Sequence, residues 1–323
     1  MNQTDHATNE PDQNSQSASD KQAITPQAKT PQGFCDLHMH STASDGTDLP
    51  QALPAIAKAN GLSAIALTDH DTTQGLAECA AACEALGVHF VPGIELSTDP
   101  RVVRHEPLPA GQLGTLHILG LFVDPQNATL IEIHERMKET RLQRNPQIIE
   151  KLNELGVRVT YDEVIELAGE LDTKIIGRPH IAQLLVRKGY VKSIADAFAK
   201  YIGEGKPGYA RKDLLLPGDA IEAIHAAGGL AVLAHPCQLR CPNDDALAHA
   251  VAKLQDMRLD AIETLHCDHT PAQTALYAQL AVKFNLLASG GSDYHGTRKA
   301  QPMGSENVPL GVYEALRDQA AQK

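Results

Sequence analysis

The chain has 323 residues, with 28 Lys and Arg against 40 Asp and Glu, so its formal net charge at pH 7 is −12 when histidine is neutral. This balance argues against broad binding to a long nucleic-acid backbone, which needs a basic surface, although bound metal ions could still recruit a small phosphorylated substrate. No basic segment followed by an apolar leader is apparent, and no apolar run approaches the roughly 20 residues that span a membrane. We therefore expect a cytoplasmic protein that does not insert into membranes.

The first 32 residues differ in composition from the rest of the chain. Residues 1–32 are rich in Gln, Asn, Ser, Thr, Asp and Ala, with almost no large apolar side chain. Such a segment cannot bury enough surface to offset its ordering entropy, so we predict a disordered N-terminal tail.

From Gly33 onward, short apolar runs alternate with helical patterns, which is typical of βα units and a parallel sheet. The seven predicted strands are Phe34–His40, Ala64–Thr68, Phe90–Glu95, Leu116–Phe122, Leu230–Ala234, Ala261–Leu265 and Leu286–Ser289. Predicted helices between them include Leu49–Asn60, Gly75–Leu86, Asp219–Ala227 and Pro271–Phe284. Seven strands favour a closed α/β barrel, with an open doubly wound sheet as the alternative.

The middle of the chain has an almost entirely helical pattern. Thr160 and Glu163 have the spacing of a capping box ahead of an apolar face, and Pro146 either starts a new helix or kinks a long one. We predict that residues 33–124 and 213–323 form the barrel, while residues 125–212 form a helical insertion that covers the site.

The first predicted strand carries two histidines with the same orientation. Asp36, His38 and His40 alternate with apolar residues, so they point to one face of the strand. Two histidines at this spacing can share a metal centre. The following Ser-Asp-Gly turn places Asp45 just beyond the strand.

Other titratable side chains recur where predicted strands end. The second strand is followed by Asp69, His70 and Asp71, and further along the chain come Glu95, His117, His235, Asp293 and His295. Each alone has an ordinary explanation: a histidine on an apolar strand is usually a core residue, and an aspartate at a strand end often caps a helix. Their recurrence favours a site, because the carboxyl ends of parallel barrel strands converge on one face.

Nine of these side chains are candidate ligands: His38, His40, Asp45, His70, Glu95, His117, His235, Asp293 and His295. Imidazole and carboxylate groups without thiolate suit zinc, manganese or iron. Nine ligands are too many for one ion and fit two or three, with Glu95 a natural bridge. Three divalent ions would outweigh three carboxylates and a hydroxide by about two charges, which favours a phosphoester substrate.

The six cysteines do not alter this picture. Cys35, Cys79, Cys83, Cys237, Cys241 and Cys267 show no CxxC spacing. We interpret them as free thiols in a reducing compartment rather than as a metal site.

The motifs resemble those of a known family. The run DLHMHSTASDG, followed by TDHD, GIE, HILG, AHP and GSDYHG, resembles the polymerase and histidinol phosphatase (PHP) superfamily across residues 33–323. The order of the motifs and the helical insertion are most similar to bacterial nucleoside 3′,5′-bisphosphate phosphatases, some relatives of which are 5′–3′ exoribonucleases acting on short RNA.

The resemblance implies a distorted TIM-like (β/α)₇ barrel with a trinuclear site, commonly of manganese, and removal of the 3′-phosphate from substrates such as adenosine 3′,5′-bisphosphate. It also implies that the nine positions above are the metal ligands. We count Asp45, His70 and Glu95 as catalytic as well. Asp69 or a bound water is the candidate proton donor to the leaving group.

Substrate contacts are expected from the insertion. Arg141 and Arg144 share one helical face and can bind phosphate bidentately, and Gly177, Arg178 and His180 form a turn entering a helix, whose N-terminus favours anions. Lys212 lies where the chain returns to the barrel. His266 and His269 follow a strand end and are expected to line the pocket.

Three other functions stay open at this point. A phosphatase for a small metabolite such as histidinol phosphate would turn over simple phosphomonoesters equally well. An amidohydrolase also carries two histidines on its first barrel strand. A non-catalytic metal-binding accessory module would be purified without bound metal.

Overall fold

The strands of the computed structural model, which describes residues 33–104, 114–169 and 175–323, form one sheet in the order β7-β6-β5-β4-β3-β2-β1-β8. They are β1 (Phe34–Asp36), β2 (Leu62–Leu67), β3 (His89–Thr98), β4 (Leu116–Leu121), β5 (Leu230–Leu233), β6 (Ala261–His266), β7 (Leu287–Gly291) and β8 (Val308–Pro309). The predicted tail, residues 1–32, lies outside the described residues.

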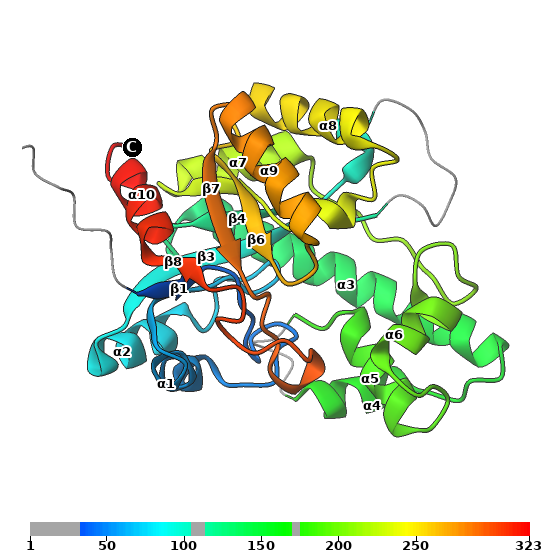
Figure 1. Cartoon of the computed structure of the whole chain (residues 1–323). Coiled ribbons are helices and arrows are strands. Elements are labelled where there is room, and N and C mark those ends of the chain that lie inside the picture. The colour runs from blue at the N-terminus through cyan, green and yellow to red at the C-terminus, as the bar shows by residue number, and fades with distance from the viewer. Residues whose placement is uncertain (1–32, 105–113, 170–174) are drawn as a thin grey trace, which may run out of the picture. The chain divides into compact units, whose positions relative to one another are not determined.

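The sheet curls into a nearly closed barrel, which confirms the predicted α/β barrel (Figure 1). The barrel closes between β7 and the segment that follows β1, where the Leu37 N–H donates to the Gly290 carbonyl at 3.1 Å and Met39 bridges Tyr294 in parallel. A side chain at Gly291 would lie 2.5 Å from the backbone nitrogen of His38. Glycine is therefore required where β7 approaches the chain that carries His38 and His40.

One strand runs against the expected direction. We predicted a parallel barrel, but β4 is antiparallel to both β3 and β5, and the short β8 adds antiparallel to β1. His117 is the second residue of β4 and pairs with Ser97 near the carboxyl end of β3. The reversal therefore places the start of β4, rather than its end, on the face where the other strands end.

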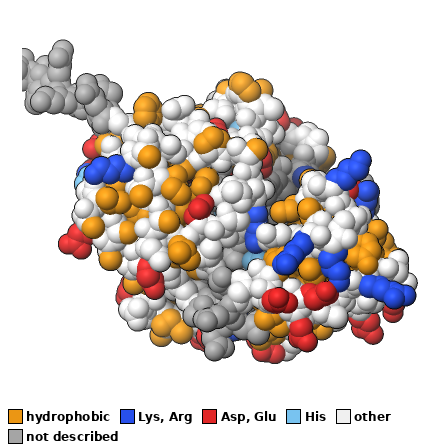
Figure 2. All heavy atoms as spheres, turned by 90° about the horizontal axis from the view of Figure 1, so that it is seen from below, with side chains coloured by type: hydrophobic (Ala, Val, Ile, Leu, Met, Phe, Trp, Pro, Cys, Tyr) orange, Lys and Arg blue, Asp and Glu red, His pale blue; other side chains and the backbone are white. Residues whose placement is uncertain are grey.

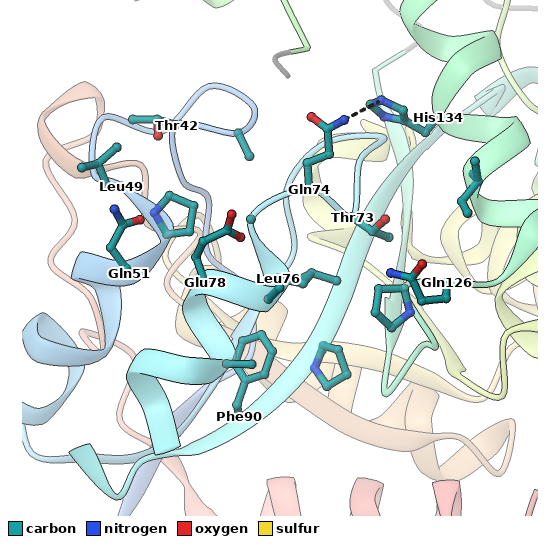
Figure 3. Close-up of a pocket in the computed structure, with 18 of the residues that line it drawn as sticks. Thr42, Leu49, Gln51, Thr73, Gln74, Leu76, Glu78, Phe90, Gln126 and His134 are labelled. Atoms are coloured by element: carbon teal, nitrogen blue, oxygen red, sulfur yellow. Dashed lines mark hydrogen bonds between the residues drawn. The ribbon is translucent and has the colours of Figure 1, made fainter. Parts of the chain in front are cut away.

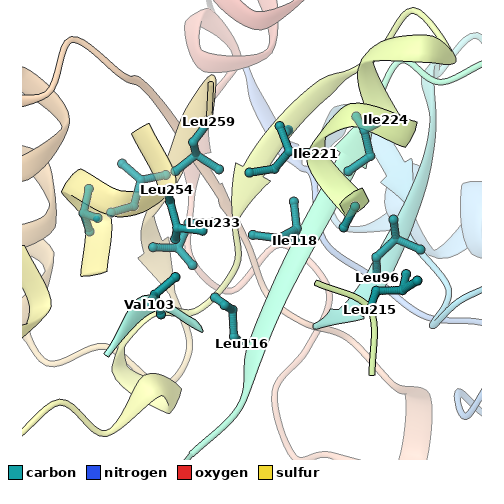
Figure 4. Close-up of a cluster of buried hydrophobic side chains, with 14 of the residues drawn as sticks. Leu96, Val103, Leu116, Ile118, Leu215, Ile221, Ile224, Leu233, Leu254 and Leu259 are labelled. Atoms are coloured by element: carbon teal, nitrogen blue, oxygen red, sulfur yellow. The ribbon is translucent and has the colours of Figure 1, made fainter. Parts of the chain in front are cut away.

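Helices surround the barrel, and the four that we predicted between strands are confirmed to within a few residues (Figure 1). The helices outside the middle of the chain are η1 (Pro50–Ala52), α1 (Leu53–Ala59), α2 (Leu76–Leu86), η2 (Pro100–Val103), α7 (Pro217–Ala226), η5 (Pro236–Leu239), α8 (Asp244–Asp256), α9 (Pro271–Lys283), η6 (Gly296–Arg298) and α10 (Leu310–Ala320). Buried side chains of β4 and β5 meet those of α7 and α8 in one hydrophobic core (Figure 4).

The middle of the chain is helical, as its pattern predicts. It contains α3 (Ala128–Glu154), α4 (Tyr161–Ala168), α5 (Arg178–Arg187), α6 (Ile194–Ala197) and the π-helix η4 (Phe198–Ile202). Pro146 lies inside α3, so it does not start a new helix, and Thr160 and Glu163 form the predicted capping box.

These helices share a hydrophobic cluster of their own, drawn from residues 148–210. Residues 31–323 nevertheless form one compact unit, so the boundaries at 125 and 212 stay a prediction. Within the described ranges, no helix is both long and apolar enough to cross a membrane.

Candidate metal centre

Five histidine rings surround the carboxylate of Glu95, which β3 carries into the barrel. Oε2 lies 2.9 Å from a nitrogen of His70, 3.2 Å from His40 and 3.4 Å from His38. Oε1 lies 2.7 Å from Nδ1 of His117 and 2.9 Å from Nε2 of His235. One carboxylate therefore joins histidine side chains that come from four separate parts of the sequence.

Two further carboxylates extend the cluster on the side of His40. Asp293 Oδ1 lies 3.3 Å from Nε2 of His40 and 3.4 Å from Nδ1 of His295. Asp45 Oδ1 lies 3.3 Å from Nε2 of His295 and 4.0 Å from Nε2 of His70.

The side chains form four groups, each with ligand atoms within 4.8 Å of one another: His40, Asp45, His70 and His295; His38, His266 and Asp293; His38, Glu95 and His235; and His70, Glu95 and His117. The structure thus brings together all nine residues that the sequence singled out. Several buried atoms that face the cluster have no hydrogen-bond partner among the described residues, namely His38 Nε2, both ring nitrogens of His40, His70 Nδ1 and Glu95 Oε2. Buried polar atoms are rarely left so, and this donor set fits cations.

The electrostatics of the cluster keep its carboxylates ionised. Burial alone would raise the pKa of Glu95, but the histidines around it, His70 first, hold that pKa well below its usual range. The pKa of Asp45 is likewise held well below its usual range against burial by His295 and His70. The histidines differ: burial lowers the pKa of His117 to about 4, which favours a neutral ring, whereas Asp293 and Glu95 raise the pKa of His40 to about 9 against the effect of burial.

Two buried carboxylates outside the nine hold the ligands in place. Glu263 of β6 lies 3.0 Å from Nδ1 of His38 through Oε1, and its Oε2 accepts the backbone N–H of His235 at 2.5 Å. Asp36 accepts the backbone N–H of His38 at 3.3 Å and that of Ser292 at 2.9 Å. Glu263 was not among the residues predicted from the sequence, although a glutamate inside an otherwise apolar strand was a usable signal.

We predict that Glu263→Gln weakens metal binding by roughly 10–100-fold, because a carboxylate that accepts from a ligating histidine fixes its tautomer and its orientation. Titration of the metal-free variant with manganese, followed by calorimetry, measures this. Glu222→Gln on α7 serves as the control for the same chemical change. Equal manganese affinity in Glu263→Gln and the native chain would contradict the prediction.

His266 faces the cluster but is oriented as a donor. Its Nδ1 accepts the backbone N–H of Asp268 at 3.1 Å, so the neutral ring carries its proton on Nε2. That nitrogen lies 3.5 Å from Asp293 Oδ2, an oxygen that also pairs with Lys299. His266 is therefore a tenth side chain at the cluster: its ligand atom groups with those of His38 and Asp293, and its buried Nε2 has no hydrogen-bond partner among the described residues. His269 packs beside His266, with ring centres 5.1 Å apart, and its Nδ1 lies 3.2 Å from the Thr264 carbonyl.

Asp69 lies behind the cluster. Its carboxylate accepts from the Ser41 N–H at 2.8 Å, the Ser41 hydroxyl at 2.6 Å and the Ser44 hydroxyl at 2.5 Å. These bonds hold the loop that carries Asp45. The geometry does not favour the predicted role of Asp69 as a proton donor, because both of its oxygens are already engaged.

Basic side chains gather around Asp71, the residue after His70; Arg141, Arg144, Arg178 and Lys212 are called the basic group below. Asp71 pairs through one oxygen with Arg141 of α3 and with Lys212, whose Nζ lies 3.3 Å away. Arg144 lies one helical turn after Arg141 and donates to Asn145 Oδ1 from Nε at 3.0 Å. The view from below in Figure 2 shows Lys and Arg side chains around a hollow in which a histidine side chain is visible.

The first residue of α5 contributes one more cation. The Arg178 guanidinium lies 5.4 Å from the ring centre of Phe198 and 5.5 Å from that of Tyr209. Within the described residues, no carboxylate lies within ion-pair distance of Arg144 or Arg178. His180 is buried and accepts the Gly177 N–H on Nδ1 at 3.1 Å, so it caps its own helix, which does not favour the predicted substrate contact.

A separate groove of about 870 Å³ lies along β3, between the start of α2 and α3 (Figure 3). Thr73, Gln74, Phe90 and His134 are among its lining residues, and none of the nine clustered residues lines it. The groove is therefore distinct from the candidate metal centre.

Comparison with known proteins gives a consistent family. The PHP domain family matches residues 36–207. The chain is 34% identical over 262 residues to the 5′-3′ exoribonuclease Rnm of Escherichia coli K12, covering 80% of this chain and 84% of that protein. It is also 34% identical over 260 residues to a 3′,5′-nucleoside bisphosphate phosphatase of Chromobacterium violaceum, covering 80% and 86%.

A solved structure agrees with this family. A protein of Bifidobacterium adolescentis, provisionally described as a metal-dependent phosphoesterase, superposes with a TM-score of 0.80 at 28% identity, covering 90% of this chain and 98% of that one. A barrel with clustered imidazole and carboxylate groups at its strand ends defines a metal-dependent hydrolase. The chain belongs to the PHP domain family. Family and site together support phosphoester hydrolysis as its class of reaction.

Proposed function

We propose that the chain removes the 3′-phosphate from nucleoside 3′,5′-bisphosphates such as adenosine 3′,5′-bisphosphate. The observation that carries the proposal is the adjacency of two anion-binding features. The candidate metal centre includes His70. The next residue, Asp71, pairs with two side chains of the basic group, Arg141 and Lys212. A substrate with two phosphates can use both features at once.

The nine clustered side chains fit two or three divalent ions, since His38, His70 and Glu95 each belong to two of the four groups. When bound, such ions polarise phosphoryl oxygens and lower the pKa of an attacking water. We propose manganese first, with zinc and iron as alternatives that the same donor set accepts. Arg144, Arg178 and Lys212 would bind the phosphate that does not react, and the α5 N-terminus at Gly177 would assist them.

We also propose that the helical insertion acts as a substrate cap. Two contacts support this, because both connect it to loops that carry the candidate metal ligands. The Ile175 N–H donates to the Ala43 carbonyl at 3.3 Å. Arg298 donates to the Asp45 carbonyl at 2.6 Å and to Gln183 Oε1 of α5 at 2.7 Å.

The test is phosphate release from adenosine 3′,5′-bisphosphate by the manganese-loaded protein. We expect one phosphate per substrate, none from AMP, and loss of release in His235→Ala. Metal content measured on the same samples shows whether the variant fails to bind metal or fails to react. No release from a protein with confirmed bound metal would rule out this substrate.

Short RNA is a second candidate substrate. The relative from Escherichia coli is named a 5′-3′ exoribonuclease, and a 5′-phosphorylated end offers the basic group the same phosphate as a nucleoside bisphosphate. We expect a 5′-phosphorylated trinucleotide to be shortened from its 5′ end. The same trinucleotide with a 5′-hydroxyl is the matched control.

The other functions have simple discriminating tests. Equal turnover of simple phosphomonoesters would favour a small-metabolite phosphatase, and hydrolysis of amides but not phosphates would favour an amidohydrolase. Protein purified without chelator and lacking metal would favour an accessory module. For the compartment, the six free cysteines support the cytoplasm.

We predict that the affinity for AMP depends on pH because of Lys212. Burial and the nearby Arg141 lower the pKa of Lys212 to about 7, against the opposing effect of Asp71. A protonated Lys212 attracts a phosphate and a neutral one does not, so affinity for AMP should fall between pH 7 and 8.5, by roughly tenfold per unit at most. Calorimetry of the metal-loaded protein across this range measures the fall.

Lys212→Met is the comparison, because it removes this titration while Arg141 and Arg144 stay charged. The difference in AMP affinity between native chain and variant should shrink as the pH rises. A constant difference from pH 7 to 8.5 would contradict the prediction.

A further inference from the structure

The carboxylate of Asp71 occupies an unusual position between the barrel and the helices of the middle of the chain. It is fully buried, and its Oδ2 forms ion pairs with both Arg141 and Lys212. The same oxygen accepts the Ser97 hydroxyl at 3.1 Å, while Oδ1 accepts the Ser97 N–H at 2.8 Å. Asp71 is thus fixed to β3 on one side and to two cations on the other.

The two cations come from the first helix and from the end of the helical segment. Arg141 lies in the middle of α3, the first helix of the segment, and Lys212 lies where the segment ends and the chain returns toward β5. The backbone of Asp71 has φ 54°, in the left-handed region. The side chain of its neighbour His70 lies instead beside Glu95, with Nδ1 2.9 Å from Oε2.

We propose that Asp71 is a positioning residue for substrate recognition: it fixes Arg141 and Lys212, and with them α3 and the end of the helical segment, so that the basic group can take the substrate's second phosphate. The inference rests on the proposed function. It assigns Asp71 no contact with the reacting atoms.

The balance of charge explains why a carboxylate is needed. Four cations gather here, namely Arg141, Arg144, Arg178 and Lys212. Burial lowers the pKa of both Arg144 and Lys212, and the nearby Arg141 lowers each pKa further. Asp71 is the carboxylate that forms ion pairs with this group within the described residues. One negative charge holds two of the cations in place but leaves the group with a net positive charge for an anionic ligand.

A neutral side chain could keep the backbone turn but could not perform this task. Asparagine tolerates a positive φ at least as well as aspartate, and its carbonyl oxygen can still accept the Ser97 N–H. It cannot offer a negative charge to Arg141 and Lys212, which would then repel each other. Asp71→Asn therefore separates the ionic role from the local backbone role.

The experiment measures AMP affinity by calorimetry and metal content on the manganese-loaded native chain and on Asp71→Asn. We expect the Kd for AMP to rise roughly tenfold or more with metal content unchanged. With adenosine 3′,5′-bisphosphate as substrate, KM should rise by a larger factor than kcat falls. Asp99→Asn is the matched control, since Asp99 is also buried and also pairs with an arginine, Arg101.

The outcomes are distinct. AMP affinity within twofold of the native value in a folded variant would overturn the inference, and so would loss of metal, which would mean that Asp71 acts through His70. If Asp71→Asn does not fold, Ser97→Ala decides, because it removes one bond to the carboxylate without removing the charge: a Kd raised several-fold supports the inference, and an unchanged Kd overturns it. If the native chain itself neither binds AMP nor releases phosphate, the proposed function fails and the inference falls with it.

Discussion

Replacing Glu95 by glutamine should lower phosphate release roughly 10³-fold, which corresponds to about 4 kcal/mol of activation free energy, and should remove most of the bound metal. Glu95 is fully buried, and its two oxygens face five histidine nitrogens at 2.7 to 3.4 Å. Glutamine keeps the size of the side chain but loses the charge that lets one group bridge several cations. Phosphate release and metal per chain, measured on the same preparation, test the prediction.

Glu132→Gln is the control for this change, because Glu132 lies exposed on α3. It should match the native chain in both measurements. A Glu95→Gln protein with native metal content and native rate would show that the four side-chain groups do not work as one centre.

Replacing Arg178 by methionine should reduce the preference for a bisphosphate over p-nitrophenyl phosphate by roughly 10–100-fold, the equivalent of about 1.5–3 kcal/mol for a hydrogen bond to a charged group. Methionine can still pack against Phe198 and Tyr209, so the loss reports mainly the guanidinium charge. The ratio of kcat/KM for the two substrates measures the effect.

Two further variants sharpen this prediction. Arg178→Lys keeps the charge without the bidentate geometry and should recover part of the preference. Arg187→Met changes an exposed arginine at the other end of the same helix and should leave the ratio as in the native chain. An unchanged ratio in Arg178→Met would remove Arg178 from substrate recognition.

The two predictions separate the two parts of the proposed site. The Glu95→Gln variant tests whether the clustered side chains bind the metals on which the chemistry depends. The Arg178→Met variant tests whether a second phosphate is recognised outside that cluster. A chain that passes the first test and fails the second would still be a metal-dependent phosphoesterase, but one whose substrate carries a single phosphate.

The sequence by itself determined the class of fold and the identity of the clustered residues. The predicted strand alternation put His38 and His40 on one face, although β1 ends at Asp36 and both residues lie beyond it. Glu95 and His235 were expected at strand ends, whereas in the structure Glu95 lies inside β3, which continues to Thr98, and His235 follows β5 by two residues. All four side chains still meet in one cluster. The predicted features are local properties, since side-chain direction in a strand and the termination of a strand depend on neighbouring residues. The helical nature of the middle segment was readable for the same reason, with Thr160 and Glu163 marking the start of α4.

The tertiary structure decided which groups meet and in what role. His117 reaches Glu95 because β4 runs antiparallel, a direction that no local pattern specifies. Glu263 contacts His38 across 225 residues of sequence, and Asp71 contacts Arg141 and Lys212 across 70 and 141 residues. Pairings of this kind follow from how the strands and the helical segment pack. Residue type and spacing could therefore identify the candidate residues but not their partners. Only the packing showed that Asp69 holds the loop of Ser41 and Ser44, that His180 caps its own helix, and that Asp71 pairs with the basic group.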